Sequence, residues 1–230
     1  DNQVNFEFNV DISSNCVNTA HNSPERIHTY EFYNENNESI LLSKNYFSLN
    51  VMVNEAEYSF DKYISILVRL ITNYNKISKY SKPIRIGLQK TNVCYLSDLM
   101  RIQDYFSNVA FNVLDLLQKN DGYSCRNCNL STELRKNSTN ILYNRNIQEG
   151  QMNASDGDPF TSYQVILDCI VYNENTYEIQ EFSDEDGECE KFVRKLNELE
   201  FEVYIKSLTD GFIYKLTETE FIDNNIEGVV

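Results

Sequence analysis

The spacing of apolar residues changes sharply within the first third of the chain, and this change constrains the fold more than any other feature. Apolar and polar residues alternate in 4–11 and 27–33, and short apolar stretches follow at 40–42 and 46–53. Alternation with a period of two is typical of a half-buried strand. Because 34–37 has the composition of a turn, we expect antiparallel strands in succession.

The pattern that follows is helical. Apolar residues recur every three or four positions from Phe60 to Ile77, which predicts an amphipathic helix of about five turns. The period of two returns after Pro83, so we expect a strand from Ile84 towards Tyr95. A second helix is predicted over about 99–117, with Ser97 as its N-cap.

The second half of the chain is less regular. Residues 119–158 are polar, which favours a domain boundary or a long excursion with one short strand at 141–143. Strands are expected at 162–172 and 176–182, followed by a helix that carries Phe192, Leu196 and Leu199. Residues 201–218 fit two interpretations, a hairpin that turns at Asp210–Gly211 or a helix.

Strands followed by a helix occur twice, around 46–94 and around 162–200. We therefore expect an α+β fold in which antiparallel sheets carry long amphipathic helices packed on one face. The repetition suggests two related halves, an N-terminal α+β half over 1–120 and a C-terminal α+β half over 121–230. A single compact domain is the alternative.

The formal net charge is −15, with 35 acidic and 20 basic residues. A negative surface repels phosphate backbones and anionic lipid heads, which disfavours direct binding to nucleic acid or to a membrane. A negative surface suits binding to a basic protein partner, or mimicry of nucleic acid. The alternative is that the acidic residues only keep the protein soluble. No apolar run is long enough to span a bilayer, and Asp1 to Asn5 do not form a signal peptide. We expect a cytoplasmic protein with reduced thiols.

Cys125 and Cys128 form the sharpest local pattern in the sequence, because two thiolates at this spacing can hold zinc. A structural zinc site needs four ligands, and a distant group such as Cys16, His21 or His28 would have to complete it. We therefore expect no bound metal and no cofactor, with this pair as a weak candidate metal site.

No sequence pattern indicates a reaction. The acidic run at 184–186 does not place ligands at the required positions of a calcium loop. A nucleophile would need His21 or His28 as its base, and neither lies in a recognised context. We therefore favour a protein that is not an enzyme.

The strand after Pro83 is the most informative candidate site. Ile84, Ile86 and Leu88 share one face, so that Arg85, Gly87, Gln89 and Thr91 share the other. Glycine within a strand indicates a bulge or the close approach of another group, and arginine beside it can hold a carboxylate or phosphate through two donors. The alternative is that Arg85 pairs with a neighbouring acid and Gly87 lies under an aromatic ring. The candidate ligand-binding residues are Arg85, Gly87, Gln89 and Asn92.

This segment also carries a resemblance. Arg85-Ile86-Gly87-Leu88 followed by Asn92, after a helix that starts with Tyr58-X-Phe60, resembles a sporadically distributed family of uncharacterised bacterial proteins. Its members have an Arg-Ile-Gly-Leu-Arg-Tyr-Ile-Asn-like strand after a long helix, and Gln89, Lys90 and Thr91 depart from that motif. The resemblance covers about 46–106 and is looser over 162–216. It implies an α+β protein and supplies no catalytic residues.

Two functions are therefore compared below. The first is a non-enzymatic binding or regulatory module that acts on a protein partner, with a basic partner favoured by the charge. The second is an enzyme or small-ligand binder that uses the strand face of Arg85 and Gly87. Nothing in the sequence sets an oligomeric state.

Overall fold

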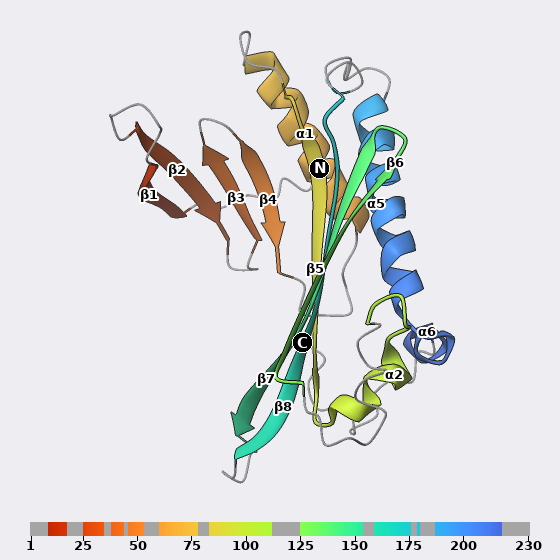
Figure 1. The fold of residues 1–230 in the computed structure, drawn as a ribbon. Coiled ribbons are helices and arrows are strands. Elements are labelled where there is room, and N and C mark those ends of the chain that lie inside the picture. Colours follow the sequence, from red (N-terminus) through yellow and green to blue (C-terminus); the bar gives the residue numbers. More distant parts are fainter. Residues whose placement is uncertain are drawn as a thin grey trace. The chain divides into compact units, whose positions relative to one another are not determined.

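A computed structural model describes most of the chain, namely residues 9–17, 25–34, 38–43, 46–52, 60–77, 83–111, 125–153, 159–175, 179 and 187–217. The fold is α+β, and its two sheets each contain four antiparallel strands (Figure 1). The chain divides into two compact units, residues 1–63 and 64–230, which are described separately.

The first unit contains a sheet of strands paired in chain order, β1-β2-β3-β4. Their bounds are β1 Asn9–Val17, β2 Glu25–Tyr33, β3 Glu38–Ser43 and β4 Phe47–Val51. The strands predicted at 27–33, 40–42 and 46–53 are confirmed as antiparallel neighbours. Of the strand predicted at 4–11, the structure describes residues 9–11, which lie in β1.

Helix α1 (Phe60–Ile77) crosses the division between the units, and it confirms the helix predicted from the three-to-four spacing. Ile64 and Ile71 are buried, whereas Asp61 and Arg69 are exposed. The burial of one side of the helix is the physical reason that its apolar residues recur with this period.

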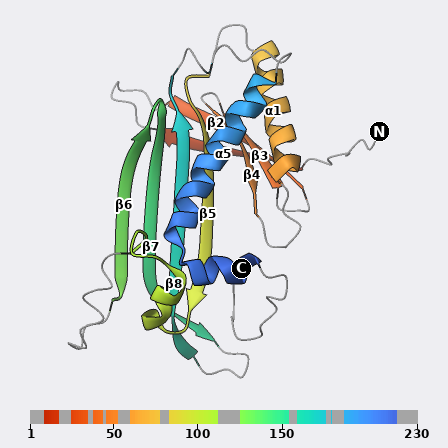
Figure 2. The ribbon, with the colours of Figure 1, turned by 90° about the vertical axis from the view of Figure 1, so that its right-hand side faces the viewer.

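The second unit is built on a sheet with the strand order β5-β8-β7-β6. Helix α5 (Glu188–Ser207) packs on one face of this sheet (Figure 2). The strand bounds are β5 Ile86–Leu96, β6 Asn127–Lys136, β7 Thr139–Asn153 and β8 Pro159–Asn173. We call the sheet face under α5 the inner face and the opposite one the outer face. The inner face and α5 share a core that includes Val165, Leu167, Val171, Leu196 and Leu199.

The strands predicted after Pro83 and at 162–172 are confirmed as β5 and β8. The interpretation of 119–158 as an excursion with one short strand is wrong, because β6 and β7 form a long hairpin there. Asn137 adopts a φ of 57° in the turn, a backbone conformation that asparagine tolerates better than most residues. The outer-face positions of this hairpin are mostly polar, so its composition resembled that of a loop.

The helix predicted over 99–117 is wrong beyond its first turns. A 3-10 turn η1 (Leu99–Arg101) leads into α2 (Ile102–Tyr105), and Phe106 is already extended and bridged to Leu208. The N-cap is Asp98, whose side chain accepts a hydrogen bond from the Met100 amide at 2.9 Å. The buried pairing of Phe106 overrides local helix propensity, and residues 112–117 lie outside the described part of the chain.

The helical interpretation of 201–218 is correct. Helix α5 continues to Ser207, and Asp210 begins α6 (Asp210–Thr217), so the alternative hairpin at this point is wrong. Most of the strand predicted at 176–182 lies outside the described residues; Ile179 is buried.

The predicted boundary between residues 120 and 121 also lies outside the described residues. The sheet of the second unit joins strands from both sides of this position, because β5 pairs with β8 along its whole length. The compact units of the structure instead divide after Tyr63.

Candidate functional site

The predicted ligand-binding residues of β5 do not all lie on one face. Gly87 and Gln89 are exposed on the outer face. Asn92 is paired with the buried Leu167, so strand alternation places Asn92 on the inner face. The structure therefore brings together Arg85, Gly87 and Gln89 but not Asn92.

Arg85 and Gly87 both lie close to Tyr172, which is the pairing partner of Gly87 in β8. The guanidinium carbon of Arg85 lies 3.8 Å from the centroid of the Tyr172 ring. A Cβ atom added to Gly87 would lie 3.0 Å from the Tyr172 Cβ and 3.3 Å from the Val171 carbonyl oxygen. Glycine thus permits the close approach of the Tyr172 Cβ and of the β8 backbone, which agrees with the expectation that Gly87 marks the close approach of another group.

Arg85 does not pair with an acid in the way that the alternative interpretation of this strand assumed. No carboxylate of a described residue forms an ion pair with the Arg85 guanidinium, and the Arg85 side chain is exposed. An arginine that is stacked on a ring keeps the edge of its guanidinium available, and a carboxylate or phosphate can accept two hydrogen bonds from that edge.

Asp168 is the centre of a polar cluster next to Gln89 on the outer face. Its Oδ1 accepts hydrogen bonds from Gln89 Nε2 and from Thr91 Oγ1, each at 2.8 Å. Its Oδ2 accepts a hydrogen bond from Asn144 Nδ2 at 3.3 Å. The donors come from the two strands on either side of β8, β5 and β7, and together they compensate the charge of a carboxylate on a sheet surface.

The outer face also carries apolar side chains on either side of Asp168. Apart from Asp168, residues 165–171 of β8 are apolar on both faces of the strand, and Val165 and Val171 on the inner face are at most 1% exposed. Ile166 and Ile170 point to the outer face and remain half-buried. A strand that is apolar on both sides is typical of a sheet covered on both faces.

These residues define the surface that we call the outer patch. Its apolar side chains lie on either side of the polar cluster around Asp168, and a surface that mixes apolar and polar side chains in this way is found in protein interfaces. The outer patch consists of Gly87, Gln89, Thr91, Val93, Ser131, Leu142, Asn144, Ile166, Asp168, Ile170 and Tyr172.

The cysteine pair of the candidate metal site lies where both thiols are favoured over their thiolates. Burial raises the pKa of Cys125 and of Cys128, and an unfavourable charge interaction between the two thiols also raises the pKa of Cys128. A reactive thiol needs the opposite shift. Within the described ranges, no group of three or more His, Cys, Asp or Glu side chains is placed to hold a metal ion.

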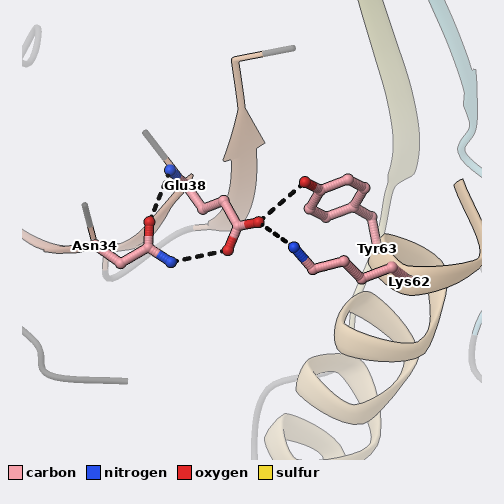
Figure 3. A network of polar contacts seen from close by, with 4 residues as sticks. All are labelled: Asn34, Glu38, Lys62 and Tyr63. Atoms are coloured by element: carbon pink, nitrogen blue, oxygen red, sulfur yellow. Dashed lines mark hydrogen bonds and ion pairs between the residues drawn. The ribbon is translucent and has the colours of Figure 1, made fainter. Parts of the chain in front are cut away.

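One polar network was missed by the analysis of the sequence. In the first unit, Glu38 begins β3 and is 6% exposed, and its carboxylate accepts hydrogen bonds from three residues (Figure 3). The donors are Lys62 Nζ at 2.6 Å, Tyr63 Oη at 2.9 Å and Asn34 Nδ2 at 2.8 Å. Burial raises the pKa of Glu38, but these hydrogen bonds outweigh it and hold the pKa below its usual value.

This network joins the first turn of α1 to the start of β3. All the polar groups drawn in Figure 3 have a partner, and a saturated network of this kind stabilises a fold. The adjacent Lys62 and Tyr63 at the start of a predicted helix were visible in the sequence, but their shared acceptor was not.

The negative charge is distributed unevenly along the chain. The described residues contain 17 of the 35 acidic and 16 of the 20 basic residues, which leaves 18 acidic and 4 basic residues in the other segments. Several acidic side chains of α5 also form ion pairs within the helix, such as Glu190 with Arg194 and Glu202 with Lys206. The excess of acidic residues therefore belongs mostly to segments such as 181–186 and 218–227 of the sequence.

Within the described residues, no helix has both the length and the apolar character needed to cross a membrane. No family model, no curated protein and no solved structure matches this chain.

Proposed function

We propose that this protein is a non-enzymatic binding or regulatory module that recognises a protein partner through the outer patch. The observation that carries the proposal is that β8 has apolar side chains on both of its faces. Ile166 and Ile170 lie on the face opposite the core and are half-buried. A partner that covers them would remove apolar surface from water, at about 25 cal/mol per Å².

The chemistry of the outer patch supports a protein partner over a small molecule. The donors around Asp168 already satisfy its carboxylate, so this cluster offers polar contacts and not a reactive group. A surface that combines apolar side chains with satisfied polar ones suits a folded protein.

The charge distribution favours a basic partner. Two strongly acidic sequence segments, 178–186 and 218–227, flank the residues of α5 and α6 in the sequence. Such charges accelerate the encounter with a basic protein, and salt screens them. In this proposal the acidic segments attract the partner and the outer patch recognises it.

Affinity capture from the native host, at low and high salt, tests the proposal. The double variant I166A/I170A is expected to lose the captured protein, because truncation of two central side chains removes most of the apolar contact. The double variant K195A/E198A changes exposed residues of α5 and should capture as much protein as the wild type. Equal capture by I166A/I170A and the wild type would reject the outer patch.

A second candidate function follows from Arg85. Its guanidinium is stacked on Tyr172 and has no ion-pair partner among the described residues, which favours binding of an acidic small ligand. Fluorescence-based screening of carboxylates and phosphates should then detect binding that Arg85→Ala abolishes. Unchanged binding by Arg85→Ala would dispose of this candidate.

The sequence resemblance to the sporadically distributed bacterial family is kept as part of the proposal. It is supported by the strand that follows a long helix, since β5 comes after α1 in the order that the motif requires. We also propose that the chain consists of two related α+β halves and that it is located in the cytoplasm.

A further inference from the structure

Strand β6 forms one edge of the second sheet, with β7 as its only strand neighbour among the described residues (Figure 2). It is 10 residues long and contains no proline or glycine. An unprotected edge of this length presents a row of backbone donors and acceptors to any extended segment.

The hairpin geometry identifies which backbone groups are open. The pair Lys136–Thr139 flanks a two-residue turn, so these two residues exchange both backbone hydrogen bonds. Bonded pairs then occur at every second position along the ladder. The amides and carbonyls of Ser131, Glu133 and Arg135 therefore point away from β7, to the open edge.

The side chains near the end of β6 carry opposite charges at alternate positions. Glu133 and Arg135 share the outer face and neither forms an ion pair with another described residue, although Arg135 Nε donates to the Asn137 carbonyl at 3.2 Å. Leu134 lies between them, is paired with the buried Ile141 on the inner face, and is still 48% exposed.

We propose that β6 pairs antiparallel with β6 of a second copy of this chain, around a twofold axis at Leu134. This register places Glu133 of each copy opposite Arg135 of the other, and these are the residues with open backbone groups. The two Leu134 side chains meet at the axis, in a non-hydrogen-bonded pair where side chains lie closest.

Three features of the segment around Leu134 thus favour a second copy of β6 as the partner of this sheet edge. The residues with open backbone groups, Glu133 and Arg135, lie opposite each other in the proposed register. Each Glu133 faces an Arg135 of the other copy, and the two exposed Leu134 side chains contact each other. A twofold contact is self-complementary in this way by necessity. The result is a continuous eight-stranded sheet with α5 of both copies on the same side. This inference does not depend on the proposed function.

Analytical ultracentrifugation of the intact chain at micromolar concentration tests the inference with a charge exchange. Glu133→Arg alone places like charges opposite each other, and so does Arg135→Glu alone, so each variant should dimerise about tenfold or more weakly than the wild type. An equimolar mixture of the two variants restores both opposite pairs and should form a heterodimer. The double variant E133R/R135E should dimerise like the wild type.

Glu198→Arg is the matched control, because it makes the same change of charge on the exposed face of α5. It should sediment as the wild type does, and circular dichroism should show that all variants are folded. A wild-type chain that stays monomeric throughout the micromolar range would overturn the inference. Failure of the two single variants to associate with each other would also overturn it, since their mixture restores both opposite-charge pairs of the proposed register.

Discussion

The ammonium nitrogen of Lys90 lies 2.9 Å from the carboxylate of Glu200, which is almost completely buried where α5 packs on β5. Lys90 also donates a hydrogen bond to Asn197 Oδ1 at 2.7 Å. Burial raises the pKa of Glu200, and the hydrogen bond and charge of Lys90 offset this effect only in part. The ion pair therefore stabilises the packing of α5 only while both partners are present.

Removal of the cation alone should be costly. We expect Lys90→Met to lower the free energy of unfolding by about 3 kcal/mol, because Glu200 is left as an unpaired buried charge. The double variant K90M/E200Q should recover part of this loss. Lys191→Met, which removes an exposed ion pair with Glu188, should cost less than about 0.5 kcal/mol. Urea denaturation measures all three, and equal losses for Lys90→Met and Lys191→Met would contradict the role of burial.

The Lys90→Met variant should also respond differently to pH. A carboxyl group whose folded pKa is raised binds its proton more readily in the folded state, so stability falls as pH rises from the unfolded towards the folded pKa. Without Lys90, the pKa of Glu200 should rise further. As pH rises above the usual carboxyl pKa of 4.5, stability should then decline more steeply in Lys90→Met than in the wild type, and K90M/E200Q should remove this difference.

Glu38 is expected to show the opposite dependence on pH. Its folded pKa is below the usual 4.5, so its contribution to stability is complete above the unfolded pKa and is lost as pH falls towards the folded pKa. Glu38→Gln should therefore be least stable relative to the wild type at neutral pH, and the difference should shrink on acidification. NMR titration of the carboxyl carbons measures the pKa directly. A Glu38 pKa at or above its usual value would contradict the network in Figure 3.

Gly87 should not tolerate a side chain. We expect Gly87→Ala to cost about 1–3 kcal/mol, because the new methyl group is too close to Tyr172 and to the Val171 carbonyl. Gly150→Ala is the matched control in the same sheet, since no atom lies within 4 Å of the added Cβ, and it should be neutral or slightly stabilising. Thermal unfolding of both variants checks the prediction, and a neutral Gly87→Ala would show that Tyr172 can move aside.

The buried hydroxyl pair of Tyr143 and Ser207 predicts an asymmetry. Tyr143 Oη donates to Ser207 Oγ at 2.7 Å, and Ser207 Oγ donates to the Val203 carbonyl at 2.8 Å. Burial raises the pKa of Tyr143 to about 12, so the phenol remains a donor over the whole physiological range. Ser207→Ala leaves the phenol without an acceptor and should cost about 1–3 kcal/mol, more than the roughly 1 kcal/mol expected for Tyr143→Phe. Urea denaturation that ranks the two in reverse order would contradict this assignment.

Most helices and strands of the described chain could be predicted because their signals are local. The spacing from Phe60 to Ile77 is helical by itself, and residues 162–172 are apolar enough to require a strand. The hairpin of β6 and β7 was missed because asparagines occupy its outer positions, where they bond to neighbouring strands and not to their own backbone. The end of the helix at Phe106 was missed because its bridge partner, Leu208, is remote in sequence.

The sequence by itself determined that strands precede a long helix, that Arg85, Gly87 and Gln89 share a strand face, and that acids outnumber bases. Only the tertiary structure decided that Asn92 lies on the opposite face and that the close approach of Tyr172 explains Gly87. The physical reason is the range of the interactions. Periodicity reflects burial of one side of a single element, whereas the partners of Asp168 and Glu200 depend on strand register and helix packing between residues far apart in the chain.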